Sequence, residues 1–211
     1  MGNVYALADD TRENQRMNSS PIDWLWNTGI LQFGYFVSDE EVAPVRFCPE
    51  YLPAYPQLLA EVAQLTLPHL DVSEIDHLIV TSNSVPLGVA LSLQTGLSLV
   101  YSRGRGEAAV YDLVGSYNSG HISALLVNHL EDIAALKKFM SNARSVGLET
   151  RKIVTLLETK PIGELAGIPV SSVFRLSNIV QALLSAGRLS DGQAQAVLKW
   201  VESRVNTHSK V

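Results

Sequence analysis

Short apolar runs that alternate with helical intervals are the feature that most constrains the fold of this chain. Five such runs lie at residues 77–81, 97–101, 122–127, 153–157 and 169–174. The intervals 86–95 and 131–146 are helical in character, and in the second Ile133, Leu136, Met140 and Ala143 share one face. Because the runs are apolar throughout, we expect strands that are buried on both faces. The pattern predicts an α/β domain with a mainly parallel sheet between helices.

The remaining segments predict one domain preceded by an arm. We expect residues 1–20 to form a flexible arm because they lack apolar periodicity. Residues 21–211 are expected to form a single domain, with a small N-terminal subdomain made mainly by 21–55. Further helices are expected from Pro21 to about Gly29, over 56–67, over 177–186, and after a capping-box signature at Ser190 and Gln193.

The distribution of charge excludes one class of partner. The net charge is −5, and residues 1–136 contain no lysine, with sixteen acidic residues against five arginines. Residues 137–211 carry eleven basic residues against five acidic ones. No run of Lys or Arg interleaves with aromatic residues, so we expect no nucleic-acid partner. No apolar stretch is long enough for a membrane span and the first residues do not resemble a signal peptide, so we expect a cytoplasmic protein without a membrane partner.

Several common chemistries have no support in the sequence. The five histidines show no metal-ligand spacing and the single cysteine, Cys48, rules out an internal disulfide, so we expect no metal site built by the protein alone. The sequence contains no G-x-S-x-G elbow, no Walker lysine motif and no G-x-G-x-x-G fingerprint. Hydrolases of the G-x-S-x-G type and nucleotide-binding folds with these loops are therefore not indicated.

The order of segments resembles the type I phosphoribosyltransferases, and most closely the orotate phosphoribosyltransferases. The similar segments are 29–36 (GILQFGYF), 55–56 (YP), 76–87 (DHLIVTSNSVPL), 99–103 (LVYSR), 114–120 (VGSYNSG) and the strand 122–127 (ISALLV). The resemblance spans about residues 22–203. It implies the fold of that family, with a central sheet and an N-terminal hood that receives the base. It also implies a homodimer, magnesium as cofactor if the chain is an active enzyme, and a nucleotide-like or phosphorylated small molecule as ligand.

The segment after the strand 122–127 departs from the family pattern. In the family this strand ends in two acidic residues that bind ribose, and a Thr/Gly turn at a helix N-terminus then binds the 5′-phosphate. One alignment puts Asn128 and His129 at the acidic positions. The other keeps Glu131 and Asp132 as the acids and then supplies Ala134 to Lys138 in place of the phosphate turn. Glu131 and Asp132 also suit the first turn of a helix, where the helix dipole favours carboxylates.

Three other segments carry candidate ligand-binding residues. The loop 103–113 lacks the lysine and histidine that the family uses, but Arg103 and Arg105 could bind an anion. Ser82, Asn83 and Ser84 lie between a strand and a helix, where they would either bind a ligand or cap the helix. The acidic segment 38–41 (SDEE) occupies the place of a basic hood segment and argues against an anionic base.

These features lead to three hypotheses about function. The first is a phosphoribosyltransferase-like protein that has lost or altered the parental reaction and binds a nucleotide-like or phosphorylated ligand, or acts as a regulatory or scaffold subunit. The alternative is an active Mg-dependent enzyme that transfers ribose 5-phosphate from phosphoribosyl pyrophosphate to a pyrimidine-like base. A purely structural partner protein is the third. No catalytic residue is assigned, and the candidates are Arg103, Arg105 and His129.

Overall fold

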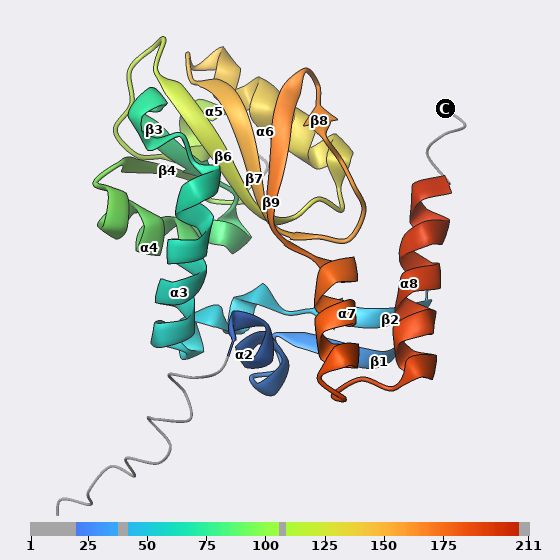
Figure 1. Cartoon of the computed structure of the whole chain (residues 1–211). Coiled ribbons are helices and arrows are strands. Elements are labelled where there is room, and N and C mark those ends of the chain that lie inside the picture. The colour runs from blue at the N-terminus through green and yellow to red at the C-terminus, as the bar shows by residue number, and fades with distance from the viewer. Residues whose placement is uncertain (1–19, 38–41, 106–108, 207–211) are drawn as a thin grey trace, which may run out of the picture.

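The computed structural model describes residues 20–37, 42–105 and 109–206. Its main feature is a seven-stranded sheet with the strand order β5-β4-β3-β6-β7-β9-β8 (Figure 1). The strands are β3 (His77–Val80), β4 (Ser98–Ser102), β5 (Leu113–Val114), β6 (Ile122–His129), β7 (Glu149–Glu158), β8 (Glu164–Leu165) and β9 (Ile168–Arg175). The five predicted strands are confirmed as β3, β4, β6, β7 and β9, and they pair in parallel. The sequence did not predict β5 and β8, which are antiparallel two-residue strands at the edges.

Two apolar cores cover the two faces of the sheet, as the continuous apolar runs predict. In β3, Leu78 and Val80 pack into one core and Ile79 into the other. The first core contains apolar side chains of α3 (Pro56–Thr66) and α4 (Val85–Thr95), and the second contains those of α6 (Ile133–Ser145). Successive strand residues point to opposite faces, so a strand that is buried on both sides must be apolar at every position.

The helix ends of α6 and α8 follow known stop and start signals. Gly147, with a φ of 88°, follows the end of α6, where a glycine commonly stops a helix. Before α8 (Asp191–Asn206), the Ser190 hydroxyl accepts from the N–H of Gln193 at 3.3 Å, and the Gln193 side chain accepts from the N–H of Ser190 at 3.2 Å. This reciprocal pair is the capping box that the sequence predicted. No helix within the described residues is long and apolar enough to cross a membrane.

A small two-stranded sheet forms the hood below the main sheet (Figure 1). It consists of β1 (Leu31–Val37) and β2 (Val42–Phe47), which pair antiparallel, and it follows α2 (Pro21–Asn27). The C-terminal helices also reach this region, because α8 packs against both β2 and α7 (Leu176–Ser185). The hood therefore combines the two ends of the described chain. The predicted arm, apart from Ser20, and the acidic segment 38–41 lie outside the described residues.

Two histidines meet at the amino-terminal edge of the sheet, opposite the strand ends that carry the candidate site. His77 begins β3 and is 5% exposed, and its Nε2 lies 2.5 Å from Nδ1 of His121. The backbone N–H of Asn118 also points at His121 Nδ1, at 3.4 Å, so this nitrogen is the acceptor and His77 Nε2–H the donor. His77 Nδ1 is then a buried acceptor atom that receives no hydrogen bond from the described residues. Burial, and then the neighbouring His121, lower the pKa of His77 below its ordinary value.

Because of this pair, we expect the stability of the fold to decrease in acid. Because the pKa of His77 is lower in the folded chain than in the unfolded chain, its contribution to stability is constant above the unfolded pKa, near 6.5. Stability is expected to fall as pH drops from that value toward the folded pKa. Urea unfolding at a series of pH values measures this slope. His77→Gln should flatten the slope between neutral pH and pH of about 5. An unchanged slope in that variant would contradict the assignment.

Candidate functional site

A cleft of about 340 Å³ opens at the carboxyl-terminal ends of β3, β4 and β6. Parallel strands place their carboxyl ends at one edge of the sheet, where ligand sites of α/β proteins usually form. Six of the nine residues predicted to bind a ligand line this cleft: Ser82, Asn83, Asn128, His129, Glu131 and Asp132. The structure thus brings together side chains from the loop after β3 and from the turn after β6.

The turn after β6 is short and leads directly into a capped helix. β6 continues through Asn128 and His129, so these two residues stand at the end of the strand. Asp132 is the N-cap of α6, and its Oδ1 accepts a hydrogen bond from the backbone N–H of Ala135 at 2.8 Å. The sequence placed Glu131 and Asp132 in the first helical turn, whereas the helix starts at Ile133 and both precede it. One N–H group at the start of α6, that of Ala135, therefore already donates to a carboxylate of the chain itself.

Asn128 ties the strand end to the loop after β3. Its side chain is 4% exposed, and Nδ2 donates to the backbone carbonyl of Asn83 at 2.8 Å. Within that loop, Ser82 donates to the Asn83 side chain at 3.1 Å, and the hydroxyls of Thr81 and Ser84 lie 3.3 Å apart. Ser84, although it precedes α4, makes no side-chain capping bond. Helix capping by this loop, one of the two predictions for it, is therefore wrong for Ser84.

His129 contacts both Glu131 and Phe47. Its Nε2 lies 3.0 Å from Oε2 of Glu131, and its ring meets the ring of Phe47 edge-on at a centroid distance of 6.0 Å. The hydrogen bond from His129 is the main cause that lowers the pKa of Glu131. Nδ1 of His129 is buried and has no partner in the described part of the chain. Because Phe47 belongs to β2, His129 connects the strand end to the hood.

A larger cleft of about 670 Å³ lies between the hood, α8 and the turn after β6. His129, Glu131 and Asp132 form one side, and residues that the sequence did not single out form the other. Arg46 lies over the ring of Phe36 and Arg204 over the ring of Trp200, each with its guanidinium carbon 4.5 Å from the ring centroid. Planar guanidinium and aromatic groups suit a flat ligand that carries negative charge.

The base of the loop after β4 is held by a buried carboxylate. Asp112 is 7% exposed and accepts from the Ser102 hydroxyl and, at 2.9 Å, from the backbone N–H of Arg105. The guanidinium of Arg103 donates to the carbonyl of Tyr111 at 3.2 Å, and both arginines are exposed. Residues 106–108 lie outside the described residues. Arg103 and Arg105 thus extend from a backbone held by hydrogen bonds next to Ser102, and neither of them lines the cleft.

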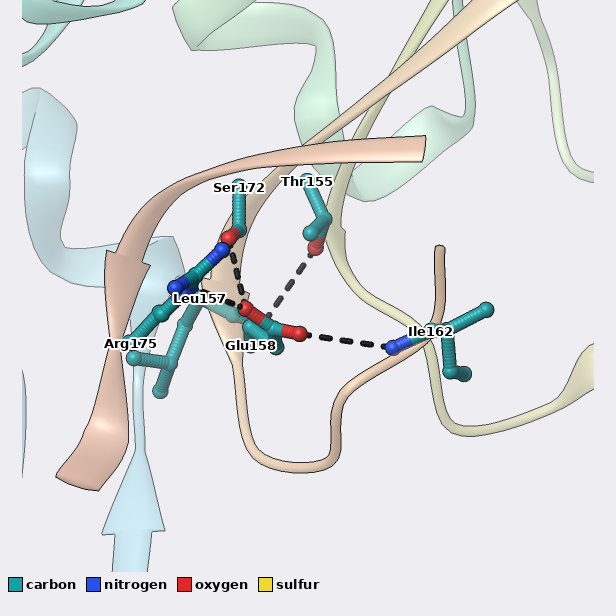
Figure 2. Close-up of polar contacts among 6 residues, drawn as sticks. All are labelled: Thr155, Leu157, Glu158, Ile162, Ser172 and Arg175. Atoms are coloured by element: carbon teal, nitrogen blue, oxygen red, sulfur yellow. Dashed lines mark hydrogen bonds and ion pairs between the residues drawn. The ribbon is translucent and has the colours of Figure 1, made fainter. Parts of the chain in front are cut away.

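A second, largely buried carboxylate joins the sheet to the C-terminal helices. Figure 2 shows Glu158, at the end of β7, accepting from the Ser172 hydroxyl at 2.7 Å, Nε of Arg175 at 3.0 Å and the N–H of Ile162 at 3.3 Å. Its side chain is only 11% exposed. Arg175 ends β9 and immediately precedes α7, so Glu158 stabilises the point where the chain leaves the sheet for the hood. This role could not be predicted from the sequence, since Glu158 simply follows an apolar run.

Comparison with known proteins identifies the class of this fold. No family model matches the chain. UMP synthase from Leishmania donovani is similar in structure, with a TM-score of 0.75 and 20% identity over 87% of this chain, which covers 42% of that longer protein. Orotate phosphoribosyltransferase from Francisella tularensis superposes with a TM-score of 0.67 and 16% identity over 86% of this chain and 97% of that one. The fold is that of the type I phosphoribosyltransferases.

Sequence similarity narrows this class further. Orotate phosphoribosyltransferase from Chlamydia felis is 26% identical over 201 residues, which cover 86% of this chain and 93% of that enzyme. The orotate phosphoribosyltransferase of Chlamydia caviae is also 26% identical, over 196 residues. The chain is a homologue of the orotate phosphoribosyltransferases.

Substitution of Asp132 separates capping from charge. Asp132→Ala removes the acceptor of the Ala135 N–H, so we expect a loss of about 1 kcal/mol in the free energy of unfolding. Asp132→Asn keeps an oxygen acceptor, so its free energy of unfolding should fall by at most about 0.3 kcal/mol. Urea denaturation of the two variants measures the difference. Equal stability of Asp132→Ala and the unaltered chain would show that Asp132 does not cap α6.

Substitution of Glu158 tests the joint between sheet and hood. Glu158→Ala leaves three donors without an acceptor, and we expect a loss of about 2 kcal/mol in the free energy of unfolding. Glu158→Gln retains an oxygen acceptor and should cost less. Glu164→Ala, an exposed carboxylate in β8, is the matched control. If Glu158→Ala were no worse than Glu164→Ala, the hydrogen bonds of Glu158 would not contribute to stability.

Proposed function

We propose that this orotate phosphoribosyltransferase homologue binds a nucleotide-like ligand between hood and sheet without carrying out the parental transfer. In the cell it would then act as a regulatory or scaffold subunit that responds to this ligand. The proposal rests mainly on one contact, the hydrogen bond from the Ala135 N–H to the Asp132 carboxylate.

The start of α6 is poorly suited to a phosphate. The family resemblance places the 5′-phosphate of the ribosyl donor at this helix N-terminus, where free N–H groups and the helix dipole would attract it. Here a carboxylate accepts from one of these N–H groups, and Glu131 lies beside it. A second anion at this place would meet like charge at close range, which is unfavourable.

The groups that would hold the rest of the donor are also changed or already engaged. Asn128 stands at the strand end and brings no negative charge, and its amide N–H is used by the Asn83 carbonyl. The oxygens of Glu131 and Asp132 that accept hydrogen bonds serve His129 and Ala135. The described residues contain no group of three His, Cys, Asp or Glu side chains able to hold a metal ion. The side chains of Asn128, Glu131 and Asp132 are therefore poorly suited to hold a magnesium-bound pyrophosphate.

The cleft at the hood supports a different mode of binding. Phe36, Phe47 and Trp200 offer aromatic surfaces, and the guanidinium groups of Arg46 and Arg204 lie among them. A flat base would stack on these surfaces, and its phosphate would pair with an arginine instead of with the start of α6. A nucleoside monophosphate of the pyrimidine type therefore fits the cleft better than a free ribosyl donor does.

An active transferase is the second candidate, and the comparisons favour it. The chain matches orotate phosphoribosyltransferases over 86% of its length, which supports this reading. In that case Asn128, Glu131 and Asp132 would hold the ribose, Arg103 and Arg105 the pyrophosphate, and Ser82 to Ser84 the leaving group. Asp132 would then have to release Ala135 when the donor binds.

The dimer expected from the family remains a prediction. Within the chain, the apolar face of α8 packs into the core: Val197 is 1% exposed, and Trp200 and Val201 pack against the main core. A purely structural role, the third hypothesis, predicts that neither cleft binds a small molecule.

Calorimetric titration distinguishes the three possibilities. Our proposal predicts that uridine 5′-monophosphate binds without magnesium and that Arg46→Ala weakens it by about tenfold, whereas the surface variant Arg151→Ala does not. It predicts no binding of phosphoribosyl pyrophosphate with magnesium and no turnover with orotate.

The other candidates give opposite results in the same experiment. Magnesium-dependent donor binding that Arg103→Ala/Arg105→Ala weakens, together with turnover, would establish the transferase and overturn our proposal. A folded protein that binds neither compound would leave the structural role.

A further inference from the structure

A separate cleft of about 380 Å³ lies between α6, β7 and the β8–β9 hairpin. Figure 1 shows α6 next to β8, at the end of the molecule away from α8 and the hood. Lys137, Ser141 and Arg144 of α6 line one side, and Thr150 of β7 and Ile168 of β9 lie across from them. The two positions of the β8–β9 turn, Ala166 and Gly167, have φ values of 53° and 80°, which is typical of a tight type I′ hairpin. The hairpin therefore forms a defined second wall.

The cations that line this cleft form no ion pair with any described residue. Lys137 and Arg144 have no carboxylate partner among the described residues. In contrast, four other cations of the same basic half each have one: Arg151, Lys152, Arg175 and Arg188. Glu149 also lines the cleft, but its carboxylate lies 3.6 Å from Arg151. The lining of the cleft thus carries more positive than negative charge, although the net charge of the protein is negative.

The neutral residues of the cleft complement these charges. The hydroxyls of Ser141 and Thr150 make no hydrogen bond within the described part of the chain, so they remain available as donors. Met140 and Ile168 supply an apolar floor. Lys137, Ser141 and Arg144 follow the spacing i, i+4, i+7, which places them on one face of α6. Lys137 and Arg144 are separated by about 10 Å along the helix axis, a distance that their long side chains can close around an extended anion.

We infer that this cleft binds a small polyphosphorylated molecule. Lys137 and Arg144 pair with its phosphate groups, Ser141 and Thr150 donate hydrogen bonds to phosphate oxygens, and an attached organic group lies on Met140 and Ile168. Arginine is well suited to this role because its planar guanidinium can bind two phosphate oxygens at once. The site is independent of the cleft at the hood and does not rest on the function proposed for it.

Inorganic tripolyphosphate is the probe that tests this site on the full chain. By calorimetry it should bind with one site per chain, and added salt should weaken it. Lys137→Ala/Arg144→Ala should reduce the affinity by about tenfold or more. Lys138→Ala is the matched control, because Lys138 is exposed on the same helix but does not line the cleft, and its affinity should stay within about twofold. Both side chains in the double variant are exposed, so its melting temperature without the probe should be unchanged.

Three results would overturn the inference. Tripolyphosphate could fail to bind, or the double variant could bind it as tightly as the unaltered chain. Lys138→Ala could also weaken binding as much as the double variant, which would indicate general attraction to a basic helix. In the second case, a loss confined to Arg103→Ala/Arg105→Ala would place the bound anion at the loop after β4. Since none of these results depends on uridine 5′-monophosphate, they are distinct from a failure of the proposed function.

Discussion

The hydrogen bond between Asp132 and the N–H of Ala135 is the interaction on which our account of this protein depends. A helix begins with N–H groups that have no partner within the helix, and something must accept from them. In a phosphate-binding turn the ligand is that acceptor. In this chain the Asp132 carboxylate accepts from one of these N–H groups without a ligand. We propose that the cap that stabilises the helix also limits what the cleft can bind.

The rest of the architecture brings other groups to the same edge of the sheet. Apolar residues on both faces of β3 and β6 keep these strands central and place their carboxyl ends together. Asn128 then joins the two strand ends through the carbonyl of Asn83. On the other side, Glu158 holds Arg175 where the chain leaves the sheet, and α7 and α8 continue from there to the hood. The two clefts on the hood side are thus formed where segments that are distant in the sequence pack around the sheet.

The sequence predicted much of this fold because its strongest signals are local. Apolar runs identified β3, β4, β6, β7 and β9, and Ser190 with Gln193 identified the start of α8. The edge strands β5 and β8 have two residues each, too few for any periodicity. Strand β7 begins four residues before its apolar run, since its first residues alternate between exposed and half-buried positions.

The candidate site was predictable only where it follows a strand. Residues at the ends of β3 and β6 were found, because the carboxyl ends of parallel strands must meet. Arg46, Trp200 and Arg204 come from the hood and the last helix, so only the folded structure shows that they share a cleft with His129. Asp112 and Glu158 were missed for a related reason, since a single carboxylate beside an apolar run gives no sign that it will be buried and hydrogen-bonded.

The most direct test of the central claim is the amide resonance of Ala135 in an isotope-labelled sample titrated with ribose 5-phosphate. Our account predicts that this resonance stays in place as the compound is added, because the Asp132 carboxylate already accepts from the N–H. In Asp132→Gly, which removes the carboxylate, the resonance should move as the phosphate takes its place. A saturable shift of Ala135 in the unaltered chain, equal to that in the variant, would contradict the account and show that the phosphate site of the transferase family is intact.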